Sequence, residues 1–214
     1  MKLGREKDDF QRDGFVVIRQ LLPESEFQLL AENIERYMRD VVPTLDATDA
    51  FYQDRRQPET LKQLQNMEQD EFFESYRDHR KWIEVAETLL EEPVIALGPE
   101  WFNKPPGTDH PTPAHQDNYY FNLKPANVLS IWMAMDRVDA DNGCLQYLPG
   151  SHHDGVRPHQ ATQTLGFSQG VAGYTAEESA RETPVHLEPG DVVVHHGNTI
   201  HSARSNTSAT RHRP

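Results

Sequence analysis

The sequence predicts a mainly β protein in which short strands form a barrel and helices pack around it. From Val94 onward the chain consists of short apolar runs and turn residues, and residues 128–136 alternate like a strand. Two stretches before it, at 24–41 and about 61–90, instead carry helical spacing. A length of 214 residues suits one such domain. We therefore expect a helical N-terminal support over about 24–92 and a barrel over about 94–214.

The first elements are a short strand and an amphipathic helix. The run Phe15-Val16-Val17-Ile18 is typical of a strand and is entered through Gly14. Pro23 and Glu24 then begin a helix. Apolar residues recur along it at roughly helical spacing, and they are Phe27, Leu30, Ile34, Tyr37, Met38 and Val41. This apolar stripe is expected to pack on the barrel.

Two further segments complete the predicted support. Residues 43–60 are polar, show no clear period and are expected to form a loop or lid near the mouth of the site. Residues 61–90 favour a second helical stretch with an interruption near Asp78 and His79, and Pro93 closes it.

The barrel segment contains a turn and one long insertion. Asn142-Gly143 is a strong tight-turn signal. Residues 154–183 are rich in Gly, Gln, Ser and Thr, and we expect them to form an insertion over the barrel mouth, where substrate contacts are common.

Composition narrows the class of partner. The formal charge of −13 argues against nucleic acid and against an anionic membrane surface, so a small-molecule substrate is expected. The single Cys144 cannot form an internal disulfide, and no apolar run approaches the roughly 20 residues that span a bilayer. The first residues are charged, unlike a signal peptide. These features favour a cytoplasmic location; they carry no signal for the oligomeric state.

The triplet His115-Gln116-Asp117 indicates a metal site. Side chains alternate along a strand, so His115 and Asp117 project from the same face, about 6.5 Å apart. Two imidazoles and one carboxylate on one side of a metal form the facial triad of non-haem Fe(II) oxygenases. His195, His196 and His201 all lie at or after the strand-like run 192–194, and alternation alone does not choose the third ligand among them.

An ordered set of motifs covers nearly the whole chain. These motifs lie at 13–17, 102–107, 111–121, 131–136, 142–152, 189–191 and 201–206. Together they resemble the phytanoyl-CoA dioxygenase family. The resemblance implies a double-stranded β-helix (a jelly-roll, cupin-like barrel) that uses Fe(II), 2-oxoglutarate as co-substrate and O2. It does not imply phytanoyl-CoA as the substrate.

The resemblance also implies roles for individual residues. It assigns the third metal ligand to His201. The family anchors 2-oxoglutarate with an arginine, whose planar fork suits a carboxylate. The family's spacing falls between Arg211 and Arg213, and we prefer Arg213. Trp132 corresponds to a family tryptophan beside the co-substrate, and Lys62 to a lysine that reaches it from a helix start.

The expected activity is hydroxylation of a small organic substrate with release of succinate and CO2. Related iron halogenases carry a small residue in place of the carboxylate, so Asp117 favours oxidation. The alternatives are a cupin-like metal-dependent hydrolase or isomerase and a non-catalytic metal-binding or small-molecule-binding barrel. The chain stops at Pro214, where a closing strand is expected, which leaves both the natural length and a shortened form open.

Overall fold

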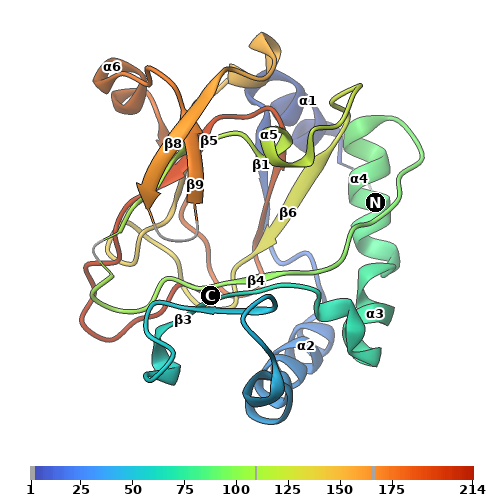
Figure 1. Ribbon diagram of the computed structural model, residues 1–214. Helices are drawn as coiled ribbons and strands as arrows, with labels where there is room; N and C mark the ends of the chain where they lie inside the picture. The colour runs from blue at the N-terminus through green and yellow to red at the C-terminus, as the bar shows by residue number, and fades with distance from the viewer. Residues whose placement is uncertain (1–2, 109, 165–166) are drawn as a thin grey trace.

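The core of the protein is a pair of antiparallel sheets, seen in the computed structural model, which describes residues 3–108, 110–164 and 167–214 (Figure 1). The first sheet has the strand order β1-β11-β6, with β1 at Phe15–Ile18, β11 at Val192–His196 and β6 at Leu129–Met133. The second has the order β10-β7-β12-β5, with β10 at Thr183–Pro184, β7 at Leu145–Tyr147, β12 at His201–Ala203 and β5 at Thr112–His115.

The two sheets face each other across a shared apolar core. Val193 of β11 and Tyr147 of β7 are both fully buried and belong to one cluster. The ring of Phe15, on β1, stacks on that of Tyr147 with centroids 4.5 Å apart. Side chains from both sheets therefore fill one interior, as in the predicted double-stranded β-helix.

Helices cover the outer face of the first sheet (Figure 1). Val192 and Val194 point away from the second sheet and pack with Val85 and Leu89 of α4, which spans Arg80–Leu90. Helix α1, Gly4–Asp13, adds Phe10 to the same cluster. Because side chains alternate along β11, Val193 and His195 face the inside of the barrel, whereas Val192 and Val194 face the helices.

A third, smaller sheet carries the order β2-β3-β4, with β2 at Ala50–Tyr52, β3 at Leu61–Leu64 and β4 at Trp101–Phe102. Helix α2, Glu24–Arg36, continues into a π-helical turn at Tyr37–Val41, and α3 spans Glu71–Arg77. Leu30 and Tyr37 pack in one cluster with Leu61 and Leu64 of β3 and with Met133 of β6. The predicted apolar stripe of α2 therefore does pack on the barrel.

The remaining elements lie near β5. Helix α5, Asp117–Phe121, follows it directly, and β9, Phe167–Val171, packs against it and pairs with β8, His159–Thr164. Helix α6 spans Ala176–Ala180, and single 3₁₀ turns lie at Val42–Thr44, Pro58–Thr60, Met67–Gln69 and Ser151–Asp154. Among the described residues, no helix combines the length and apolar character needed to cross a membrane.

Most predicted elements are confirmed, and several boundaries are wrong. Strand β1, the start of α2 and the break between α3 and α4 are as expected. Residues 61–64 form a strand instead of helix, because β3 is central in its sheet and buries Leu61 and Leu64. Residues 43–60 contain β2, and α1 was not predicted. The segment 154–183 contains the β8–β9 hairpin and α6, and its positions 165–166 lie outside the described residues.

Asp191 fixes the turn that leads into β11. Its carboxylate is 2% exposed and accepts hydrogen bonds from the backbone N–H groups of Gln20, at 3.0 Å, and Glu188, at 2.9 Å. Arg19 pairs with it at 2.6 Å. Burial opposes ionisation, but Arg19 and the backbone donors outweigh it and lower the pKa of Asp191.

Asp191→Ala should lower the free energy of unfolding by about 2–4 kcal/mol at pH 7, because a buried donor without a partner costs about 1–3 kcal/mol. The folded-state pKa is depressed, so this contribution is complete above the unfolded pKa of about 4 and is lost as pH falls through the folded pKa. Urea unfolding of the wild type and of Asp191→Ala at pH 7 measures the loss of stability, and the same comparison below pH 4 measures how much of it disappears in acid. Asp8→Ala, at an exposed position of α1, is the control. A stability difference that grew in acid would contradict this assignment.

Candidate metal centre

A cross-strand pair of histidines forms one side of the candidate site. His115 of β5 and His201 of β12 are register partners, and their ring centroids lie 4.2 Å apart. Their Nδ1 atoms lie 2.8 Å from the carbonyl of Pro113 and 3.0 Å from that of Thr199. A carbonyl can only accept, so each Nδ1 donates and each Nε2 is left as a ligand atom facing the site.

Asp117 completes the group. Its Oδ1 lies 3.6 Å from Nε2 of His115 and 3.5 Å from Nε2 of His201. In the part of the chain that the structure describes, these three residues form the one group whose ligand atoms all lie within 4.8 Å of one another. Asp117 begins α5 instead of continuing the strand as predicted. Gln116 is still extended, with φ −127° and ψ 127°, so the expected alternation survives.

The electrostatics of the three residues suit a divalent metal. Burial lowers the pKa of both His115 and His201 and keeps their imidazoles neutral. Burial also opposes ionisation of Asp117, but His201 and the hydrogen bond to His195 outweigh it and lower the pKa of that carboxyl. Neutral imidazoles and an ionised carboxylate are the forms that bind metal. The donor set fits Fe(II).

The other two candidate histidines are not part of the three-ligand group. His195 points inward, with its ring centroid 4.4 Å from that of His201, but its Nε2 lies 2.9 Å from Oδ2 of Asp117, and Oδ1 is the oxygen that faces His115 and His201. His196 points outward, with its ring 6.4 Å from Phe10 and 5.6 Å from His152. The structure thus brings His201, as the sequence predicted, to the two residues of the triplet.

A narrow cavity of about 40 Å³ lies beside this group. Its lining residues are Lys62, Gln63, Phe102, Asn103, Lys104, His110, Pro111, Thr112, Thr164 and Arg213. The backbones of Lys104 and Arg213 exchange two hydrogen bonds, at 3.2 and 3.3 Å, which fixes the last residues of the chain here. The Arg213 side chain is buried, and its Cζ lies 5.6 Å from the Trp132 ring centroid. No described residue forms a hydrogen bond with its Nε.

The cavity is basic and has no acid to balance it. Burial lowers the pKa of Arg213 to about 10 and, with the charges of Arg213 and Lys62, that of Lys104 to about 6. Lys104 donates to the carbonyls of Ala203 and Arg204. Within the described residues no carboxylate forms an ion pair with Arg213. A small anion would satisfy this orphaned guanidinium.

Strand β6 places the cavity next to the three ligands. Ser130 donates to Oδ2 of Asp117 at 2.6 Å, while Trp132, two residues later on the same face, lies under Arg213. Two residues of strand span about 6.5 Å. A molecule that binds the metal with one end can therefore reach the cavity with the other.

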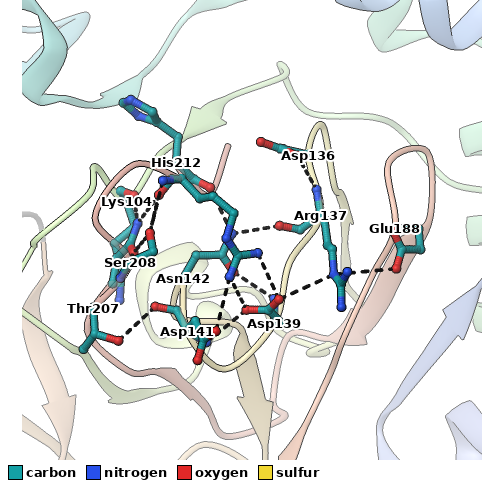
Figure 2. Close-up of polar contacts among 12 residues, drawn as sticks. Lys104, Asp136, Arg137, Asp139, Asp141, Asn142, Glu188, Thr207, Ser208 and His212 are labelled. Carbon is teal, nitrogen blue, oxygen red and sulfur yellow. Dashed lines mark hydrogen bonds and ion pairs between the residues drawn. The ribbon is translucent and has the colours of Figure 1, made fainter.

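Arg211 is directed elsewhere. Its guanidinium pairs with both carboxylate oxygens of Asp139, at 2.8 and 2.9 Å. Asn142 on the same loop donates to the carbonyl of His212, and Figure 2 shows these contacts gathered around Asp139 and Asn142. Arg211 therefore holds the C-terminal segment on a loop, and Arg213 alone of the two lines the cavity. Lys62 reaches the cavity from β3, not from a helix start.

Four residues of the site were not predicted from the sequence. They are Ser130, His195 and Tyr147 around Asp117, and Lys104 in the cavity. Lys104 lies in the 102–107 motif of the resemblance, which implies no role for it, and the sequence makes His195 a candidate only for the third ligand. Alternation from Trp132 back to Ser130, and from Val193 on to His195, is the signal that could have placed both on the inner face.

Comparisons with known proteins show what the whole chain is similar to. A family model described as phytanoyl-CoA dioxygenase matches residues 10–213. The bovine peroxisomal phytanoyl-CoA dioxygenase is 30% identical over 93% of this chain, which spans 63% of that protein. The crystal structure of EvdO2 from Micromonospora carbonacea var. aurantiaca complexed with 2-oxoglutarate is 25% identical with a TM-score of 0.75, covering 100% of this chain and 88% of that one. The apoform of EctD from S. alaskensis shares the fold, with 20% identity, a TM-score of 0.77 and coverage of 98% and 73%.

Removing one ligand should abolish Fe(II) binding or weaken it by orders of magnitude, because each supplies one of three bonds. His115→Ala, Asp117→Ala and His201→Ala should all show this in anaerobic titrations, while His196→Ala should retain nearly full affinity since its ring faces away. Retained affinity in His201→Ala together with loss in His196→Ala would show that the third ligand is misassigned.

Proposed function

The chain belongs to the phytanoyl-CoA dioxygenase family, and from that premise we propose that it is a non-haem Fe(II)/2-oxoglutarate-dependent dioxygenase. The reaction we propose is hydroxylation of a small organic molecule with release of succinate and CO2. The observation that supports it most is the pairing of two features: three metal-ligand side chains and, beside them, a buried arginine whose Nε has no hydrogen-bond partner among the described residues. The first suits Fe(II), and the second suits the far carboxylate of a dicarboxylic acid.

Each group has a distinct task in this proposal. When bound, the iron with 2-oxoglutarate and O2 supplies the oxidising chemistry. His115, Asp117 and His201 hold the metal on one side and leave the other side open. Arg213 binds the distal carboxylate, supported by Lys62, and Trp132 forms the wall beneath the guanidinium. The burial of His115 and His201, with Asp117 only 19% exposed, limits the access of bulk water to the reacting atoms.

The rival functions explain less of the site. A cupin-like hydrolase or isomerase would use the three metal ligands but has no need of an unpaired arginine in a narrow cavity. A non-catalytic binding barrel leaves that arginine equally unexplained. The burial of a cation without a partner is costly, so a function that supplies the partner is favoured.

The substrate and the location are separate proposals. The bovine relative is named peroxisomal and acts, by its name, on phytanoyl-CoA, but this chain spans 63% of it. We propose a small organic molecule as substrate, without assigning phytanoyl-CoA to that role, and a cytoplasmic location. The formal charge of −13 supports a partner other than nucleic acid or an anionic membrane.

Arg213→Ala should weaken 2-oxoglutarate binding at least tenfold, because truncating one partner of a buried charge pair costs about 2–5 kcal/mol and about 1.4 kcal/mol is a factor of ten. The visible charge-transfer absorption of the anaerobic Fe(II) protein, titrated with 2-oxoglutarate, measures this affinity. Fe(II) binding should be nearly unchanged, since the three ligands are intact.

Arg211→Ala is the matched control, because Arg211 pairs with Asp139 away from the cavity. Its effect on 2-oxoglutarate affinity should be much smaller. The reverse ranking would assign the anchor to Arg211. A wild-type protein that binds Fe(II) but shows neither the absorption band nor succinate formation in O2 would favour the hydrolase or isomerase.

A further inference from the structure

We propose that His195 is a positioning residue that restricts Asp117 to a single metal-binding oxygen, and that Tyr147 sets the orientation of its ring. This inference rests on the proposed function, because it concerns the same metal centre. It adds a task for two residues that neither bind the metal nor line the anion cavity.

The two oxygens of Asp117 have different surroundings. Oδ1 faces Nε2 of His115 and of His201, at 3.6 and 3.5 Å. Oδ2 is 2.6 Å from Oγ of Ser130 and 2.9 Å from Nε2 of His195. Two donors thus occupy Oδ2, whereas Oδ1 is left for the metal.

Tyr147 determines which nitrogen of His195 carries the proton. The Tyr147 hydroxyl lies 3.0 Å from Nδ1 of His195, and the residue is fully buried. If this hydroxyl donates to Nδ1, the imidazole proton lies on Nε2 and points at Asp117. In that arrangement the Tyr147 hydroxyl donates to Nδ1 of His195, and Nε2 of His195 donates to Asp117. Each donor in this row of three residues, Tyr147, His195 and Asp117, therefore has an acceptor.

The row is held rigidly because it joins both sheets. His195 is on β11, where its register partners are Phe15 of β1 and Ser130 of β6. Tyr147 is on β7 of the other sheet, where His201 is its register partner. Tyr147 is further clamped by stacking on Phe15, with ring centroids 4.5 Å apart. The carboxylate is therefore approached by donors from the first sheet and by ligands from the second.

The different surroundings of the two Asp117 oxygens affect how much room the metal has for the co-substrate. A carboxylate that binds through one oxygen occupies one coordination position and leaves room for a chelating co-substrate. Freed of its hydrogen bonds, Asp117 could turn and bind through both oxygens, which would take a position that 2-oxoglutarate needs. Partners of metal ligands typically contribute 10-fold to 100-fold to metal affinity or activity.

Three variants test the inference. His195→Phe keeps a buried aromatic ring but removes the donor, His195→Gln restores an N–H at a similar reach, and His153→Phe makes the same change at an exposed histidine. For each protein, anaerobic competition with a chromogenic chelator gives the Fe(II) affinity. Titration of the Fe(II) protein with 2-oxoglutarate, followed by its visible charge-transfer absorption, gives the co-substrate affinity.

We expect His195→Phe to lose at least tenfold in Fe(II) affinity, and to bind 2-oxoglutarate more weakly with an altered absorption band although Arg213 is untouched. His195→Gln should recover most of both, and His153→Phe should match the wild type. If His195→Phe does not fold, Tyr147→Phe, which removes one hydroxyl, should show a smaller loss in the same direction.

Failure of the inference differs from failure of the proposed function. Wild-type values in His195→Phe for both affinities and for the band would overturn the positioning role while leaving the dioxygenase proposal standing. A loss in His195→Phe that His195→Gln does not recover would also overturn it, since packing would then be the cause. A wild-type protein that binds no Fe(II) would overturn both.

Discussion

The partly buried carboxylate of Asp117, with its contacts to four neighbouring side chains, is the feature on which the organisation of the site depends. One of its oxygens faces His115 and His201 of the second sheet, and the other accepts hydrogen bonds from Ser130 and His195 of the first. The two donors on Oδ2 stabilise the ionised carboxylate, and a bound metal would satisfy Oδ1. The same carboxylate therefore connects the two sheets and defines the open side of the metal centre.

The basic cavity differs from Asp117, because the described residues supply no opposite charge for its buried arginine. Arg213 and Lys104 are both buried, and the pKa of each is lowered by that burial, with no carboxylate among the described residues paired to Arg213. Removing a cation from water costs several kcal/mol unless an anion replaces the solvent. The burial of Arg213 therefore carries a local cost at the cavity that an anionic ligand would relieve, even in a chain of net charge −13.

The sequence was most informative where the physics is local. Alternation along a strand depends on two neighbouring residues, so it related His115 to Asp117 correctly even though α5 begins at Asp117. Helical spacing likewise located α2 and the break before α4. Alternation failed to identify β3, because a four-residue strand with buried Leu61 and Leu64 at its ends has the same spacing as one helical turn. Only its pairing with β2 and β4 decides between them.

Contacts between distant strands were beyond such local reasoning. Tyr147 and His195 lie on different sheets, and neither residue type at its own position indicates the other. The choice between Arg211 and Arg213 was similarly unresolved by spacing, because it depends on where Asp139 lies after folding. Alternation would place Arg211 and Arg213 on one face of an extended segment, yet Arg211 is bound to Asp139 and Arg213 lines the cavity, where the paired backbones of Lys104 and Arg213 hold it. Long-range contacts therefore decide what the local rule does not, namely which of the two arginines enters the cavity.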